Sequence, residues 1–524
     1  MNTTDSRRRS FSLPLIPLLP IAPLLASPQA WGSHLYHSVV ERFNNKSGGG
    51  RPISLTKYAA REPWMHGGER YPWFPGPLAE SPAQRRYPVW WTGDSVQLEI
   101  AVQAMVDSGV HGMKPYVHSD CGGDGNYHGD VAHLRWTAHC VLGTILRFHG
   151  ADHRPWHDGP GDNVTVTATE DTIRKYLQMR YRLAPSLVAA GHQVTQHAFP
   201  LVARLDMFWP EHAPLSASNM SYLFLNDTLV APIVDMESNT STRSVWIPPG
   251  HWQDAWNGTV VAGPLLATVT QPFDRIPMWH RRGSFTVTTS RPGLRVASQD
   301  WSELTLEIFP DLPDLPDLAD LADLADFADI ADIADLAGLT GSRHGNGSVD
   351  GVGGVGSVGG RPGVVRKQKV IRKQVHERDS TDVPTVIEME TDGHADSGQL
   401  TMRITAETPG QLELARGWCF RVHLRPGQRV TAVEVDGQPV PVAVGATDTT
   451  RRAAVNVLTH IEAIEASSRG AQFTQFPFAG TGTAAQFGGG PVAELTIERA
   501  GAARVVTMLV GREAATRARH DVTN

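Results

Sequence analysis

The stretch YPVWWTGDS, residues 87–95, places one acidic side chain, Asp94, shortly after two adjacent tryptophans and a glycine. A carboxyl group that is partly buried beside aromatic side chains has a raised pKa, so it can keep its proton near neutral pH and donate it in catalysis. The indole of Trp91 would supply an aromatic wall on which a ring-shaped ligand stacks. The ordinary alternative is that Asp94 caps a helix that begins at Ser95.

A second group of polar residues follows in HSDCGGDGNYHGD, residues 118–130. Asp120 precedes a cysteine and two glycines there, and glycines allow a backbone to approach a ligand closely. Three basic residues end or follow the next apolar segment: Arg147, His149 and Arg154. Carboxylates accept hydrogen bonds from hydroxyl groups and indoles stack on sugar faces, so the whole set suits a polyhydroxylated ligand. Asp120 could equally stabilise a glycine turn, and His149 could be a histidine of the core.

A metal site is a further interpretation of this segment, because several potential ligands crowd within it: His118, Asp120, Cys121, Asp124, His128 and Asp130. The C-x-x-C and H-x-x-x-H spacings that make a metal site specific do not occur among them. We therefore expect the site to contain no metal and no other cofactor.

Helices and short strands must position these residues. The apolar spacing predicts helices over residues 96–110, 132–150 and 171–191, the last of them stopped by Gly191. A short buried strand is expected within residues 111–120. A succession of strand, polar loop and helix is typical of α/β proteins, in which functional side chains cluster after strand ends.

The second half of the chain has β character. Short apolar runs between Pro, Gly and Asn turns predict an antiparallel sandwich over residues 206–300, and alternating segments predict another over residues 381–524. Between them, residues 301–380 hold aspartates at every third position from Asp311 to Asp335, then a Gly/Ser/Val tract and a basic run. A period of three matches neither helix nor strand, so we expect a low-complexity linker rather than a calcium-binding repeat.

Composition limits the partners of the chain. Its 524 residues carry a formal net charge of −7 and are 41% hydrophobic, which describes a globular protein without the charge of a nucleic-acid-binding one. The basic run lies close to the acidic repeat, so mutual neutralisation is expected there. No segment beyond the leader approaches the roughly 20 apolar residues of a membrane span. Three cysteines form no disulfide framework, although a single bridge stays open.

The first 30 residues read as basic, apolar and small-residue segments, which is the order of a secretory signal peptide. Prolines at every third position of the apolar run oppose the helix of a signal peptide and favour a disordered leader equally. The sequence holds numerous N-x-S/T sequons, which suit the secretory route; they include Asn163, Asn219, Asn226, Asn239 and Asn257. We therefore expect a secretory or extracellular location.

These pieces, in their order, resemble glycoside hydrolase family 31, the family of α-glucosidases and α-xylosidases. The likeness covers residues 31–285. RYPVWWTGDS resembles the family's acid/base segment, HSDCGG its H-D-x-G-G element, and LRWTAHCVLGTILRFHG the helix and strand before a subsite histidine. HRPW resembles the turn that follows, and VWIPPGHWQDAWNG resembles part of the β domain behind the barrel. The resemblance implies an α/β plus all-β fold: part of a (β/α)8 TIM barrel in residues 31–205, followed by two β-sandwich domains.

The resemblance also implies roles for single residues. Asp94 would be the catalytic acid/base, with Trp91 in the aromatic wall. Asp120 would bind sugar hydroxyls in the −1 subsite, with His149 as the subsite histidine. Two basic residues would also bind substrate: Lys57 and Arg154. Lys57 stands where the family has an arginine, so it keeps the charge but loses bidentate geometry.

Retaining glycosidases need two carboxylates about 5–5.5 Å apart, one of them a nucleophile. The family's nucleophilic aspartate precedes the segment that WGSHLYHSVVERF resembles, and here the Arg/Pro/Leu leader stands in that place. We therefore expect a carboxy-terminal portion of a family 31 enzyme without its nucleophile region. The main hypothesis is hydrolysis of α-glucosides or α-xylosides with retention; the alternatives are a truncated, non-catalytic relative that at most binds carbohydrate, and a metal-dependent hydrolase.

Overall fold

The computed structural model describes residues 39–43, 46, 55–56, 65–66, 69–70, 89–92, 97–111, 116–125, 127–149, 153–155, 163–197, 199–214, 220–289, 292–293, 300–312, 369–376, 384–394, 397–406, 416–425, 428–440, 492–500 and 504–512. The leader, Lys57, Asp94 and the acidic repeat beyond Leu312 lie outside these residues. The chain divides into two compact units, Met1–Trp91 and Thr92–Asn524. Each unit is described by itself.

The first unit contributes short strands. Strand β1 (Leu55–Thr56) pairs in parallel with β4 (Val89–Trp91), and β2 (Met65–His66) pairs antiparallel with β3 (Glu69–Arg70). Trp91 ends β4 and is half-buried. Parallel pairing of β1 with β4 is the arrangement expected of barrel strands.

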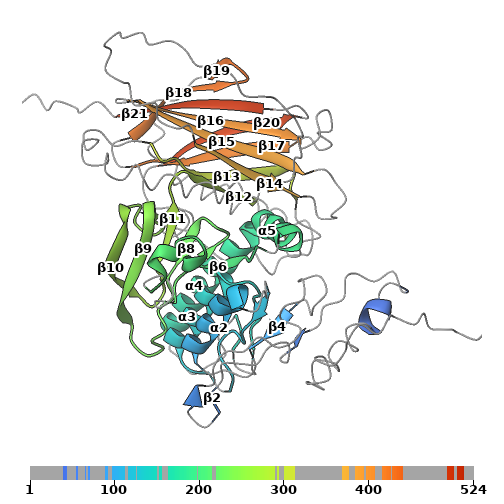
Figure 1. Ribbon diagram of the computed structural model, residues 1–524, viewed down its shortest axis with the longest axis vertical. Helices are drawn as coiled ribbons and strands as arrows, with labels where there is room; N and C mark the ends of the chain where they lie inside the picture. The colour runs from blue at the N-terminus through green and yellow to red at the C-terminus, as the bar shows by residue number, and fades with distance from the viewer. Residues whose placement is uncertain are drawn as a thin grey trace, which may run out of the picture. The chain divides into compact units, whose positions relative to one another are not determined.

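The second unit opens with the α/β part (Figure 1), whose elements are α2 (Leu98–His111), β5 (Val117–His118), α3 (Asp130–Val141), α4 (Asn163–Arg182) and α5 (Ala184–His197). The expected helix 132–150 ends early, at Val141. The buried guanidinium of Arg180 donates to the carbonyls of Val141 and Thr144, at 2.9 and 2.7 Å, and the Tyr222 hydroxyl donates to that of Leu142. These bonds satisfy carbonyls that a longer helix would have used itself.

The expected helix 171–191 is wrong at both ends. Helix α4 begins at Asn163. The helix is interrupted at Leu183, and α5 then continues past Gly191 to His197. Pro185 explains the break, because a proline inside a helix lacks the N–H that would bond four residues back. Gly191 lies inside α5, so this glycine does not end the helix. A Cβ there would meet only the Tyr116 hydroxyl, at 3.3 Å.

A six-stranded sheet follows, in the order β10-β9-β11-β8-β7-β6. Its strands are β6 (Val202–Arg204), β7 (Tyr222–Phe224), β8 (Thr228–Val230), β9 (Thr240–Asp254), β10 (Val260–Pro272) and β11 (Met278–Arg281). Its core is rich in tryptophan, with Trp209, Trp246, Trp252 and Trp279 buried together. The side chain of Arg135 on α3 donates to the carbonyl of Ser238 at 2.8 Å, which ties this sheet to the α/β part.

The last strands form a sandwich of two sheets (Figure 1), in the orders β12-β13-β17-β20 and β14-β15-β16-β21-β18-β19. The strands are β12 (Ser284–Thr289), β13 (Glu303–Phe309), β14 (Lys369–Val375), β15 (Thr385–His394), β16 (Ser397–Ala406), β17 (Arg416–His423), β18 (Gln428–Val435), β19 (Gln438–Val440), β20 (Val492–Ala500) and β21 (Arg504–Arg512). Residues of both sheets share one apolar core, which includes Leu306, Phe420, Met402 and Val506. Helix α5 packs on this sandwich, where the Ser186 hydroxyl donates to the Val287 carbonyl at 2.8 Å.

Two expected segments, residues 206–300 and 301–380, are therefore too long. Strand β12, placed in the 206–300 domain, pairs with β13 of the last sandwich, and β13 and β14 both fall in the expected linker 301–380. Strand β13 pairs with β12 and β17, and its residues from Leu304 to Phe309 are all buried. The basic run enters β14, where Arg372 lies 3.8 Å from Glu388 and Lys373 pairs with Asp227. In the part of the chain that the structure describes, no helix is long and apolar enough to span a membrane.

Candidate functional site

Asp120 lies just beyond the short strand β5 and is completely buried. The Thr144 hydroxyl fixes this strand, since it accepts from the Val117 N–H at 2.8 Å and donates to the Val117 carbonyl at 2.7 Å. The Thr92 N–H donates to the His118 carbonyl at 3.0 Å. Beyond the strand, the Gly123 N–H donates to the Asp120 carbonyl at 2.9 Å and closes a tight turn. The backbone therefore sets the place of the Asp120 carboxylate.

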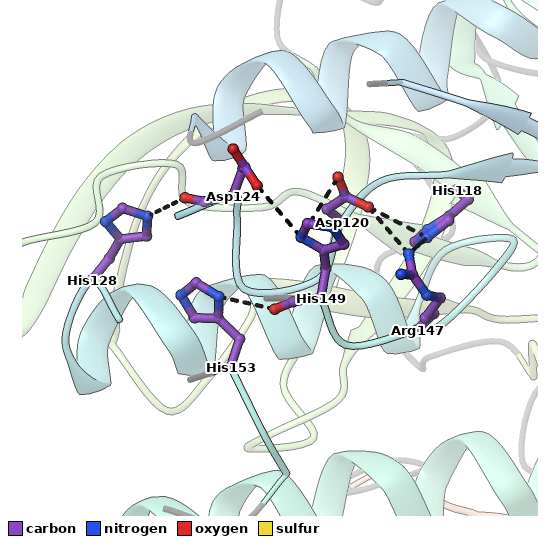
Figure 2. A network of polar contacts seen from close by, with 7 residues as sticks. All are labelled: His118, Asp120, Asp124, His128, Arg147, His149 and His153. Carbon is purple, nitrogen blue, oxygen red and sulfur yellow. Dashed lines mark hydrogen bonds and ion pairs between the residues drawn. The ribbon is translucent and has the colours of Figure 1, made fainter. Parts of the chain in front are cut away.

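A second segment lies beside the Asp120 turn and brings two basic side chains to it. The Cys121 N–H donates to the Arg147 carbonyl at 3.2 Å, and the His149 N–H donates to the Cys121 carbonyl at 3.1 Å. Figure 2 shows the result: Arg147 and His149 both reach the Asp120 carboxylate. Arg147 Nη1 lies 3.4 Å from Asp120 Oδ1, and His149 Nδ1 lies 3.9 Å from Asp120 Oδ2. The guanidinium compensates the negative charge that Asp120 brings into the interior.

His118 supports this arrangement as a neutral ring. Arg147 Nη1 donates to His118 Nε2 at 2.7 Å, and a ring nitrogen that accepts carries no proton. Burial, together with the positive charge of Arg147, lowers the pKa of His118 to about 4. One Arg147 nitrogen thus contacts both His118 and Asp120, because each Nη carries two hydrogens.

His149 stands between two carboxylates, 3.9 Å from Asp120 Oδ2 and 3.7 Å from Asp124 Oδ1. Its side chain is 22% exposed and that of Asp124 is 40% exposed, so the cluster reaches the surface on the Asp124 side, whereas the His149 Nδ1 and Asp120 Oδ2 atoms are themselves buried. Both distances are too long for direct hydrogen bonds, and a bound hydroxyl group could bridge them. A hydroxyl group bound here would have a carboxylate on one side and the His149 imidazole on the other.

The residues weighed as metal ligands have other partners. Tyr127 and Thr169 donate to the two oxygens of Asp130, the latter at 3.1 Å, and the buried Cys121 thiol donates to the Trp136 carbonyl at 3.6 Å. His128 Nε2 donates to the Asp124 carbonyl at 3.0 Å. Within the described ranges, no group of His, Cys, Asp and Glu side chains has an arrangement that could hold a metal ion.

The structure thus brings together some of the residues singled out in the sequence. Asp120 and His149 lie in one cluster, whereas the side chain of Arg154 is exposed and its carbonyl accepts from His133 Nε2 at 2.8 Å. Trp91 belongs to the first unit, and both Asp94 and Lys57 lie outside the described residues. The roles assigned to all six stay predictions.

Sequence reasoning missed that Arg147 and His118 are the direct partners of Asp120. A signal was present, because His118 precedes Asp120 by two residues and Arg147 precedes His149 by two. In extended backbone, residues two apart point to the same side. Two such pairs on adjacent segments place their four side chains together.

Comparisons with known proteins find one family over two consecutive segments of the chain, the α/β part and the six-stranded sheet that follows it. The sequence model of the glycosyl hydrolases family 31 TIM-barrel domain matches residues 79–190, and that of the glycosyl hydrolase family 31 C-terminal domain matches residues 198–285. Alpha-glucosidase 2 of Bacillus thermoamyloliquefaciens is 25% identical over 209 residues, covering 38% of this chain and 25% of that protein. An alpha-xylosidase of Saccharolobus solfataricus is 23% identical over 239 residues, covering 43% and 31%.

The fold is also similar to that of a solved structure, a mutant GH31 dextranase of Flavobacterium johnsoniae complexed with isomaltotriose. The TM-score is 0.56 at 16% sequence identity, and the likeness covers 90% of this chain and 47% of the dextranase. The match to these two relatives spans less than a third of either protein's length. The comparisons confirm the expected architecture, which is part of a TIM barrel followed by β-sandwich domains.

Proposed function

The chain belongs to glycoside hydrolase family 31, and from this premise we propose that it hydrolyses α-glucosides or α-xylosides with net retention. The observation that supports a sugar-binding role most strongly is the buried Asp120, with Arg147 at 3.4 Å and His149 at 3.9 Å. A charge-compensated carboxylate and an imidazole accept from and donate to neighbouring hydroxyl groups of one sugar ring. In this proposal Asp120 and His149 bind hydroxyls of the sugar that is cleaved.

Asp94 is proposed as the acid/base. In this proposal the Asp94 carboxyl gives its proton to the leaving oxygen as the glycosidic C–O bond breaks, while a second carboxylate bonds to the anomeric carbon. No residue of the sequence is assigned to that second role, so turnover by the full chain must establish the nucleophile. The Asp94 carboxylate then takes a proton from water as the water oxygen attacks the anomeric carbon and displaces the nucleophile. Two inversions give net retention. An aromatic neighbour such as Trp91 would keep the pKa of the acid high enough for the first step.

The alternative is a relative that binds carbohydrate without cleaving it. Because the chain matches only 25% and 31% of the length of the two relatives described above, catalysis by this chain is a proposal separate from sugar binding. Asp120, Arg147 and His149 would serve either function. The two differ in turnover and not in affinity.

Incubation of the full chain with an aryl α-glucoside and an aryl α-xyloside separates them. Hydrolysis that releases the α-anomer first, detected by proton NMR, supports a retaining glycosidase. Asp120→Asn keeps the shape of the side chain but removes its charge, so it should weaken binding of a glucose-configured iminosugar; Asp171→Asn, at an exposed acid of α4, is the matched control. Binding of the iminosugar without turnover supports the non-catalytic alternative, and neither binding nor turnover contradicts both.

We also propose a secretory or extracellular location. The order of basic, apolar and small residues in residues 1–30 supports it, as do sequons at exposed turns, of which Asn257 is one. Secretion assays on the natural full-length chain test it, and retention of all the protein inside the cell would contradict it.

A further inference from the structure

His153 lies between the two backbone segments that carry Asp120 and His149. Its side chain is 1% exposed, and Nδ1 lies 2.9 Å from the carbonyl oxygen of His149 (Figure 2). A carbonyl only accepts hydrogen bonds, so Nδ1 carries a hydrogen and donates it. The His153 imidazole is therefore hydrogen-bonded to the backbone of His149.

The same ring also touches the Asp120 turn. A Cβ on Gly122, two residues after Asp120, would lie 2.6 Å from both Cβ and Cγ of His153. Gly122 also has a φ of +102°, which glycine adopts without strain. Only glycine lets the backbone at this position pass so close to the imidazole. His153 thus meets one segment through carbon atoms and the other through a hydrogen bond.

Two further histidines hold the ring in this orientation. His128 and His133 stack on His153, with ring centroids 5.5 and 6.0 Å away and interplanar angles of 21° and 24°. His133 Nε2 also donates to the carbonyl of Arg154 at 2.8 Å, so the residue after His153 is fixed as well. Because His133 lies on helix α3, the ring is anchored to a rigid element rather than to a ligand.

We propose that His153 is a positioning residue for sugar binding, which sets the separation of the His149 imidazole from the Asp120 carboxylate. That separation is 3.9 Å from Nδ1 to Oδ2, and both atoms are buried, so its width decides whether a sugar hydroxyl can reach between them. The ligand in this inference rests on the proposed function, whereas the geometry rests on the contacts of His153 alone. A small shift of the His149 carbonyl moves the imidazole and changes the gap.

Two substitutions separate positioning from packing. His153→Asn keeps an N–H donor near the place of Nδ1 but loses half of the ring, and His153→Phe keeps a flat ring but loses the donor. The full chain is tested for its melting temperature and, by calorimetry, for its dissociation constant with the iminosugar deoxynojirimycin. We expect His153→Phe to weaken binding about tenfold, the loss typical of one buried hydrogen bond, and His153→Asn to stay close to the wild type.

The melting temperature should follow the opposite order, because His153→Asn leaves a cavity and His153→Phe fills it. Affinity that falls in the same order as the melting temperature would mean that His153 only packs, and would overturn the proposal.

A readout without sugar keeps the two proposals distinguishable. The ring signals of His149 in a long-range ¹⁵N–¹H spectrum, assigned with His149→Gln, report its environment directly. His153→Phe should shift them and His153→Asn should leave them near their wild-type positions. If the wild type binds no iminosugar, the proposed function fails, and these signals alone decide: unchanged signals in His153→Phe overturn the positioning role, and shifted signals support it.

Discussion

Arg147 Nη1 donates to His118 Nε2 at 2.7 Å, and this contact determines the charge of the imidazole. A ring nitrogen that accepts from a guanidinium has no proton, and a protonated His118 would place two positive charges in contact inside the protein. Asp120, 3.5 Å from the same Nε2, therefore gains its positive partner from Arg147 and not from His118. Asp120, Arg147 and His118 thus combine an anion, a cation and a neutral ring.

The neutral His118 makes the fold sensitive to acid. Its folded-state pKa of about 4 lies below the ordinary value of 6.5, so unfolding takes up a proton between these two pH values. The free energy of unfolding is then fully supported above pH 6.5 and falls as the pH drops toward 4, by on the order of 3 kcal/mol from this group. Urea unfolding at pH 7 and pH 4.5 measures the difference.

His118→Gln tests that assignment, because the amide oxygen can accept from Arg147 but does not titrate. The loss of stability between pH 7 and 4.5 should shrink in this variant without vanishing, since burial lowers the pKa values of His139 and His376 too. His197→Gln, at an exposed histidine of α5, is the control and should leave the loss as in the wild type. An unchanged pH dependence in His118→Gln would contradict a neutral, buried His118.

Gly122 and Gly125 form a matched pair for the packing of His153. Both have positive φ, +102° and +88°, but a Cβ at Gly122 would collide with His153 whereas one at Gly125 would have no atom within 4 Å. Gly125→Ala should cost only the left-handed backbone penalty, about 1–2 kcal/mol. Gly122→Ala should cost that amount plus about 1–3 kcal/mol of overpacking. Urea unfolding of both variants tests this, and equal losses would show that His153 does not press on Gly122.

Asn257 tests the proposed secretory route. Its side chain is exposed in the turn between β9 and β10, where its Oδ1 accepts from the Thr259 N–H at 2.8 Å. Natural full-length chain isolated from cells should carry an N-glycan there, so an endoglycosidase should lower its mass and Asn257→Gln should reduce that change. Asn226→Gln is the control, because Asn226 is half-buried with a φ of +70° and a buried Oδ1. Chain without any glycan would contradict the route.

The class and order of elements could be predicted from the sequence because apolar spacing determines them locally. Helix α2 and strand β5 lie close to where that spacing puts them. Helix ends were harder, since α3 ends where Arg180, far along the chain, takes its carbonyls. Pro185 is a local signal for the interruption between α4 and α5. The end of the helix was predicted at Gly191 instead, because glycine often ends helices.

The linker shows a different limit. Its acidic repeat has no strand period, yet the segments on both sides of it, β13 and β14, are strands of two different sheets. Strand β13 pairs with β17, which lies far along the chain, so this pairing is a tertiary property, whereas β14 pairs with the next strand, β15. The strand ends were hard to predict because low-complexity sequence follows β13 and precedes β14.

For the site, Asp120 and His149 were recognisable because glycines and strand ends surround them. The roles of Arg147 and His118 depend on the backbone bonds between Cys121 and the segment 147–149, which bring distant residues together. His153 depends on a contact with a glycine, which leaves no trace in side-chain chemistry. Contacts made by backbone atoms are therefore what the sequence conveyed least.

The proposed cleavage of α-glycosides with Asp94 as acid/base is tested by the hydrolysis rate of an aryl α-glucoside with the full chain and with its Asp94→Asn variant. We predict turnover by the wild type and a fall in kcat/KM of about 10²–10⁴-fold in Asp94→Asn, the contribution typical of a general acid/base. Asp171→Asn should keep the wild-type rate. Equal rates in the wild type and Asp94→Asn, or no hydrolysis by the wild type, would contradict the claim.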